Sequence, residues 1–179
     1  MTMERTERDI ISAFNRLLSK NDIEKITTQM IADEAMISRA TFYRYFKDKY
    51  DVLNRNYKDL LDRHLNHCSN YRDLYKELYC FARNEWSDFH RAFHTTGVNS
   101  FENYVFRYSR SVVEEITRQN RNGQGLTEEE NLQLDVFCFG TTYMYRKWTF
   151  SQYELDPDEA ADALFDIMPK SLKYYWRKP

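Results

Sequence analysis

Apolar residues recur along this chain at spacings of three and four, the period of amphipathic α-helices, and do not alternate as in strands. The first apolar stripe begins near Thr6 and ends at the polar stretch SKND. Two short stripes follow within residues 26–35 and 38–46. Longer stripes cover residues 49–66, 72–95 and 101–120, and two more begin at Thr127 and Asp156. Because residues 72–95 can hold two helices with a bend, the pattern predicts an all-α fold of about nine helices.

Capping residues mark where several of these helices begin. The start signals, in chain order, are Thr27 or Thr28, Ser38, Thr127 with Glu130, and Asp156-Pro157 with Glu159. Pro169 falls inside the last apolar stripe and removes one backbone hydrogen bond, so we expect it to bend that helix.

Composition supports a helical chain. Only four glycines and three prolines occur in 179 residues, which is too few for the turns of a many-stranded protein. Hydrophobic residues make up 42% of the chain, enough for a packed core beside 30% charged residues. Short helices give way to longer, more aromatic ones near residues 50–66, so we place a domain boundary between residues 50 and 51.

The charge of the chain is nearly balanced overall but uneven in distribution. The net charge is −2, yet residues 36–50 carry Arg39, Arg44, Lys47 and Lys49 against Asp48 alone. A local basic cluster on short helices is compatible with nucleic acid, because the distribution of charge matters more than its sum.

Three features favour a cytoplasmic protein. The amino-terminal stretch MTMERTERDI is charged from residue 4 and has no apolar signal core. The longest charge-free apolar stretch, VFCFGTTYMY, is too short to cross a bilayer, which predicts no membrane association. The widely spaced Cys68, Cys80 and Cys138 fit reduced thiols better than a disulfide framework.

Residues 26–49, ITTQMIADEAMISRATFYRYFKDK, predict two short helices joined by a tight turn at Met36. With Phe42 and Phe46 turned toward a core, the intervening positions face outward. The outward residues are Ala40, Thr41, Tyr43 and Arg44, with Arg39 at the edge. Small, hydroxyl and guanidinium side chains together suit close approach to a DNA groove, phosphate contacts and reading of base edges. The helix start after Ser38 adds backbone N–H donors.

This segment, extended to YDVL, resembles the DNA-binding region of TetR-family transcriptional regulators. The matching positions are Thr27, Ile31-Ala32, Ser38, Thr41, Phe42-Tyr43, Tyr45-Phe46 and Lys49. The resemblance covers roughly residues 6–60. Beyond residue 70, FCFGTTYMYRKW and PDEAADALFDIMPKSL resemble a carboxy-terminal domain type of Firmicutes members.

The resemblance implies a set of DNA-binding residues. Thr28 and Gln29 would lie beside a phosphate or base, and Arg39, Ala40 and Arg44 would read sequence. Thr41, Tyr43, Tyr45 and Lys49 would hold the DNA backbone, although Tyr45 can equally pack inward.

Met36 departs from the family pattern, which has glycine at this turn. A left-handed methionine costs about 1 kcal/mol, and a turn with negative φ would avoid that cost. We also expect the flexible side chain to plug the small core.

The resemblance further implies a homodimer on a near-palindromic operator in double-stranded DNA, with a small-molecule effector acting on the larger domain. The candidates for the dimer surface are Tyr145, Trp148, Leu164, Met168, Leu172 and Tyr175, each of which can instead be core. The candidates for a ligand pocket are Phe81, Trp86, Phe89, Phe93, Phe101, Tyr104, Tyr108, Phe137 and Tyr143, although aromatic stripes are more often plain core.

No pattern in the sequence indicates catalysis. There is no phosphate-binding loop, nucleophile elbow or paired carboxylate, so we expect no enzyme activity and no cofactor. His90 with His94, and His64 with His67 and Cys68, are too few ligands to predict a metal site. The alternative to a ligand-controlled repressor is a co-regulator that works mainly through protein contacts.

Overall fold

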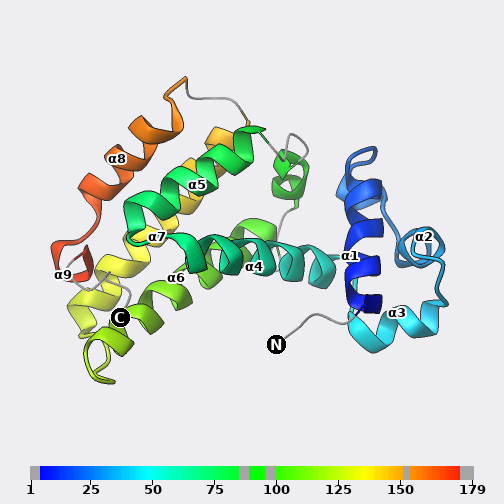
Figure 1. The fold of residues 1–179 in the computed structure, drawn as a ribbon, viewed down its shortest axis with the longest axis horizontal. Helices are drawn as coiled ribbons and strands as arrows, with labels where there is room; N and C mark the ends of the chain where they lie inside the picture. The colour runs from blue at the N-terminus through cyan, green and yellow to red at the C-terminus, as the bar shows by residue number, and fades with distance from the viewer. Residues whose placement is uncertain (1–4, 85–88, 96–99, 151–153, 174–179) are drawn as a thin grey trace. The chain divides into compact units, whose positions relative to one another are not determined.

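The computed structural model describes residues 5–84, 89–95, 100–150 and 154–173. It groups them into two compact units. The first unit holds Met1–Leu60 together with Asp88–Phe101, and the second holds Leu61–Ser87 with Glu102–Pro179. Each unit is built from helices alone among the residues described (Figure 1).

The all-α prediction is confirmed, with nine α-helices and two short 3₁₀ helices in the described part of the chain. The elements are α1 (Arg5–Leu18), η1 (Ile23–Lys25), α2 (Thr28–Glu34), α3 (Arg39–Tyr45), α4 (Lys49–His67), α5 (Tyr71–Asn84), η2 (Phe89–His94), α6 (Phe101–Asn120), α7 (Glu128–Thr149), α8 (Pro157–Ile167) and α9 (Lys170–Lys173). Within the described ranges, none of these helices has the length and apolarity that a bilayer crossing requires.

The first unit contains a three-helix head made of α1, α2 and α3. Its core is filled by side chains that are almost fully buried, among them Ile10, Phe14, Ile31 and Phe42. A charge-assisted hydrogen bond of 2.6 Å from Arg16 of α1 to Glu34 of α2 links two of the helices at the surface. Because the core positions of each helix share one face, the opposite faces of α2 and α3 are left to solvent.

The first unit extends beyond the expected boundary at residue 50. Val52, Leu53 and Tyr57 of α4 are buried, and the Tyr57 ring meets the Phe101 ring edge-on with centroids 5.3 Å apart. Phe93 adds a second edge-on contact to Phe101 at 5.0 Å. Aromatic packing therefore brings Phe93 and Phe101 back to the first unit, an arrangement that periodicity alone does not reveal.

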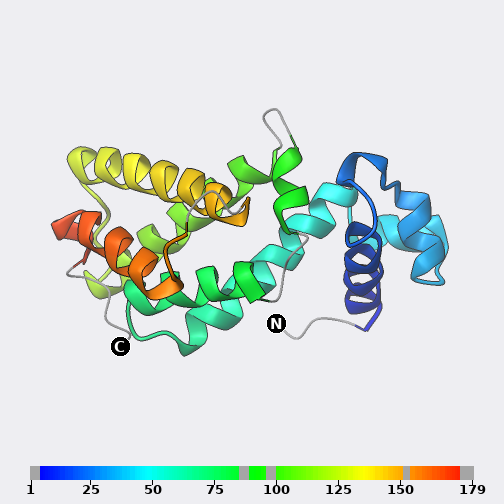
Figure 2. The same ribbon diagram turned by 90° about the horizontal axis from the view of Figure 1, so that it is seen from above.

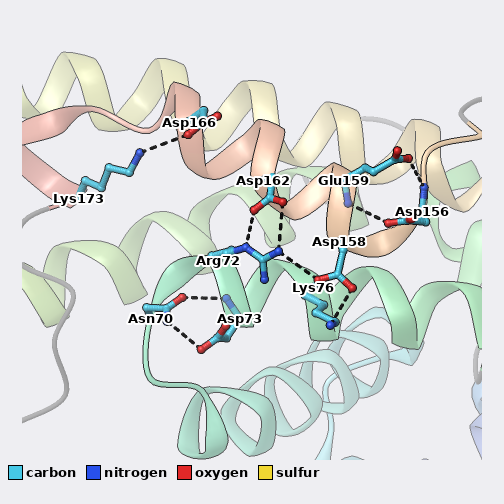
Figure 3. A network of polar contacts seen from close by, with 10 residues as sticks. All are labelled: Asn70, Arg72, Asp73, Lys76, Asp156, Asp158, Glu159, Asp162, Asp166 and Lys173. Carbon is cyan, nitrogen blue, oxygen red and sulfur yellow. Dashed lines mark hydrogen bonds and ion pairs between the residues drawn. The ribbon is translucent and has the colours of Figure 1, made fainter.

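In the second unit, α5 and α8 lie side by side (Figure 1 and Figure 2). A group of charged side chains joins them (Figure 3). Arg72 of α5 pairs with Asp162 and, at 3.1 Å, with Asp158, while the Lys76 ammonium lies 2.7 Å from Asp158. The hydrogen bonds from Lys76 and then Arg72 lower the pKa of Asp158, and the hydrogen bond from Arg72 lowers the pKa of Asp162.

The predicted capping signals of the last long helices are confirmed. Thr127 with Glu130, and Asp156 with Glu159, form reciprocal capping boxes at the starts of α7 and α8. Pro169 does not bend a continuous helix as we expected. It ends one, because a residue before proline is driven out of the helical region, and Met168 is extended at φ −60° and ψ 135°.

We predict that acid selectively weakens the docking of α5 on α8. The pKa of each aspartate is lowered below its ordinary 3.8 in the folded chain, so the ion pairs stabilise fully above about pH 4 and are lost as pH falls through the lowered pKa. The urea concentration at the unfolding midpoint should be lower for Arg72→Met than for wild type. This difference should be constant from pH 5 to 7 and shrink below pH 4. Lys170→Met, which removes an exposed charge on α9, should show no such difference. A difference that does not shrink as pH falls below 4 contradicts the assignment.

Candidate nucleic-acid interface

Two caps and one turn define the positions of α2 and α3. The Thr27 hydroxyl accepts a hydrogen bond from the Met30 N–H at 3.2 Å, and the Ser38 hydroxyl accepts one from the Thr41 N–H at 3.0 Å. Both residues are extended, as N-caps must be. Of the two candidates Thr27 and Thr28, Thr27 is therefore the N-cap of α2. The expected cap at Ser38 is confirmed.

The turn between the two helices closes α2 with the hydrogen-bond pattern of a Schellman motif. The Ile37 N–H donates to the Ala32 carbonyl at 2.9 Å, and the Met36 N–H donates to the Asp33 carbonyl at 3.0 Å. This closure requires a left-handed residue at position 36, and Met36 has φ 55°. Of the two turn conformations that the sequence left open, the structure has the left-handed one. The expectation that the side chain plugs the core is wrong, because it is 91% exposed.

On the outward side of the head, three predicted residues are in mutual contact. The Arg39 guanidinium donates to the Tyr43 hydroxyl at 3.1 Å and lies over the Tyr43 ring, 5.4 Å from its centroid. The Tyr43 and Thr28 hydroxyls are 3.3 Å apart, within hydrogen-bond distance. The hydrogen bonds with Thr28 and then Arg39 lower the pKa of Tyr43. A cation and two hydroxyls are thus gathered from α2 and α3 on one surface, a combination suited to phosphate oxygens.

The other outward residues differ in burial and in whether their polar groups already bond to a neighbouring side chain. Thr41 is half-buried, and its hydroxyl lies 2.9 Å from the Ser38 hydroxyl. The Gln29 amide donates to Asp33 at 2.7 Å. Ala40 and Arg44 are exposed, and Arg44 makes no hydrogen bond or ion pair with any described residue. Arg44 is therefore the guanidinium best placed to reach a ligand without breaking an existing contact.

Tyr45 and Lys49 are less available than the sequence led us to expect. Tyr45 is half-buried on the inner edge of α3. The Lys49 ammonium donates to the carbonyls of Ile23, Glu24 and Ile26 at 2.7, 3.1 and 3.0 Å. These contacts use all three ammonium donors, so Lys49 closes the carboxy-terminal end of η1. Its predicted contact with a DNA phosphate requires these bonds to break.

Comparison with known proteins agrees with this geometry. Residues 10–55 match the family described as bacterial regulatory proteins, tetR family. The head is a DNA-binding domain of the tetR family. The matched residues run from within α1 through α3 to the start of α4, so the family assignment rests on the head. No curated protein sequence matches the chain.

Several solved structures resemble this chain over nearly its whole length. The dihydroxyacetone kinase operon activator DhaS aligns over 97% of this chain and 99% of its own at 16% identity and a TM-score of 0.63. The fatty acid degradation regulator FadR from Bacillus halodurans aligns over 99% and 100% at 14% identity and a TM-score of 0.57. A TetR-family regulator from Haemophilus influenzae aligns over 97% of both chains at 17% identity and a TM-score of 0.54. At these identities the likeness shows a shared fold.

The residues predicted for a ligand pocket are divided between the two units. Phe93 and Phe101 belong to the first unit, whereas Phe81, Tyr104, Tyr108, Phe137 and Tyr143 belong to the second. Phe137 is buried against Tyr75, and Tyr143 is 41% exposed. Trp86 and the Phe89 side chain lie outside what the structure describes.

The residues predicted for the dimer surface are in the interior of a single chain. Tyr145, Trp148, Leu164, Met168 and Leu172 are each at most 8% exposed, and Tyr175 lies outside the described residues. Tyr145 and Trp148 are packed edge-on against Tyr79 of α5. Five of the six candidates therefore serve the core of the second unit and offer little area to a partner.

A different apolar surface, not singled out from the sequence, is open on α7. It consists of Leu132, Val136, Phe139 and Tyr143, which are 41–66% exposed and spaced by four, three and four residues, so they share one face. We call this set the α7 stripe. In the sequence, apolar residues occupy more than half of the circumference of α7. This wide apolar arc could have indicated an exposed apolar face, because a surface helix usually buries only one stripe against its own chain.

We predict that Lys49 acts on DNA binding by holding η1 and the start of α2 in place. Lys49→Met should lower the free energy of unfolding of the head by about 1–3 kcal/mol, since three carbonyls lose a charged donor. It should also weaken DNA binding without changing the slope of log affinity against log salt. Arg44→Met removes the same charge and should reduce that slope by about 0.9 for each phosphate released. Equal reductions in the two variants would show that Lys49 binds phosphate directly.

Proposed function

We propose that this TetR-family protein is a homodimeric repressor that binds a near-palindromic operator in double-stranded DNA in the cytoplasm. The observation that carries the proposal is the outward cluster of Thr28, Arg39 and Tyr43 beside the unpaired Arg44. Cationic and hydroxyl groups on one exposed helix face match the chemistry of phosphates and guanine edges. Buried Phe42 and Phe46 fix which face of α3 is outward.

Dimer formation is supported by the α7 stripe. A contiguous exposed apolar face is characteristic of a surface covered by a partner. Gly140 lies within the same face, and an added Cβ there would meet no atom within 4 Å in the single chain. Glycine inside a helix costs about 1 kcal/mol relative to alanine, and nothing described in this chain requires it. A glycine at this position would let the α7 helix of a second copy cross close to Gly140.

Two heads are also what a short recognition helix needs. The seven residues of α3 offer few contacts, so one head buries too little surface for tight binding. A two-fold dimer places two such helices about one DNA turn apart, roughly 34–36 Å, and makes the operator nearly palindromic.

Small-molecule control through the second unit completes the proposal, and Tyr104 and Tyr108 of α6 are aromatic residues of that unit that remain half-buried. The second candidate is a co-regulator without an inducer. It is favoured by the packing of Phe137 against Tyr75 and of Phe93 against Phe101, which commits these predicted pocket residues to cores. The sign of control is also open to test, because DhaS is described as an operon activator.

We predict sequence-selective DNA binding by the purified full chain. Selection from a genomic library should return two half-sites about ten base pairs apart, with affinity that falls steeply between 50 and 200 mM salt. Tyr43→Phe removes the hydroxyl that joins Thr28 and Arg39 and should weaken binding with little effect on unfolding. A reporter placed behind the recovered site should rise when the protein is deleted if it represses. No enrichment at low salt would reject the DNA-binding proposal and favour the co-regulator.

We predict that Val136→Glu yields a monomer. A carboxylate in the middle of the α7 stripe would be buried unpaired in a dimer, which is strongly unfavourable, yet the site is 66% exposed in the single chain. Sedimentation should give a dimer for wild type and a monomer for the variant, with operator affinity reduced at least about tenfold. Leu155→Glu, which adds the same charge at a 44% exposed leucine outside α7, should remain dimeric. A dimeric Val136→Glu protein excludes the α7 stripe as the interface.

A further inference from the structure

The left-handed turn at position 36 is occupied by a residue type unsuited to it. Among the described residues, three have a left-handed backbone, namely Met36, Asn122 and Gly123. Asparagine and glycine tolerate this conformation, since one bonds locally and the other lacks a Cβ. Methionine has neither advantage. The turn after α6 thus follows the usual rule, and the turn between α2 and α3 breaks it.

The described chain offers no compensation for this strain. Packing of the side chain can offset a strained backbone. The Met36 side chain is 91% exposed, more than any other large hydrophobic residue identified as exposed. The residue that can make the apolar contact of a Schellman closure is the next one, Ile37, which is half-buried. Strain that the fold does not offset is concentrated at functional sites, which points to a function for the exposed side chain.

The position of Met36 points to DNA. It lies three residues before Arg39, the first residue of α3, and two before the cap Ser38. In helix-turn-helix proteins this end of the recognition helix meets base edges in the major groove. The apolar group that base pairs present in that groove is the C5-methyl of thymine. An exposed, flexible thioether at this end of α3 therefore has one natural apolar partner in the groove.

We propose that Met36 contacts a thymine C5-methyl group in each operator half-site and so contributes to sequence specificity. The inference rests on the proposed DNA-binding function and extends it to a residue outside the set predicted from the sequence. The left-handed backbone is retained because it is needed for the turn, and the methionine is retained at this strained position because its side chain binds DNA.

A methyl-deletion cycle tests the contact. Each thymine of the selected operator is replaced in turn by deoxyuridine, which lacks only the C5-methyl, in both half-sites. For wild type, one replacement should weaken binding roughly fourfold per half-site, the effect of one buried methyl group. For Met36→Ala the same replacement should have no effect, because the partner side chain is already gone. Alanine retains a Cβ and hence the backbone strain, so this variant isolates the side chain.

Two further variants separate contact from strain. Met36→Gly should bind about as weakly as Met36→Ala while its denaturation midpoint rises, because glycine relieves the left-handed strain. Leu155→Ala truncates an exposed apolar residue far along the chain and should match wild type in affinity. Opposite movements of stability and affinity in Met36→Gly are the signature of strain retained for function.

The possible failures are distinguishable. Wild-type protein that prefers no DNA sequence removes the proposed function and this inference with it. Selective wild-type binding with Met36→Ala or Met36→Gly equal to wild type overturns the inference alone. Weaker binding by Met36→Ala that is uncoupled from every thymine methyl also overturns it, because the side chain would then touch the sugar-phosphate backbone.

Discussion

The surface proposed to bind DNA depends on how a seven-residue helix is held in place. Helices this short are not stable by themselves in water, so α3 exists only through its surroundings. Ser38 caps its start, the Schellman closure of α2 sets its direction, and buried Phe42 fixes its rotation. Once these three constraints act, the outward positions of Arg39, Tyr43 and Arg44 have no freedom to be elsewhere. The chemistry of the surface follows from the packing beneath it.

The local excess of positive charge divides into parts with different uses. Lys49 satisfies three backbone carbonyls, and Arg39 lies on Tyr43, whereas Arg44 is exposed and unpaired among the described residues. Arg39, Tyr43 and Thr28 restrain one another before any ligand arrives, which reduces the conformational entropy lost on binding. Charge counting alone treats these side chains as equivalent. Their partners show that Lys49 supports the fold, Arg39 is preorganised and Arg44 is available to a ligand.

Features set by neighbouring residues were predictable from the sequence. Helix caps depend on side chains three residues apart, so the caps at Thr27, Ser38, Thr127 and Asp156 could be found. The partners of Lys49 are 23 to 26 residues away, and no periodicity encodes them. Apolar residues surround most of α7, so the pattern could not decide which arc is core. Tyr145 and Trp148 proved to be core, and the α7 stripe proved to be exposed.

Aromatic abundance is compatible with a core, a ligand pocket and an interface, and only the exposure of each side chain separates them. Phe137 and Phe101 are buried against other rings, which makes them core, whereas Phe139 is 65% exposed on the α7 stripe. The described aromatic side chains therefore argue more strongly for a protein partner than for a bound small molecule. A head with one seven-residue recognition helix independently requires a second copy to bind an operator tightly. The proposed dimer along the α7 stripe would meet both requirements, because it would cover the exposed apolar face and supply the second head.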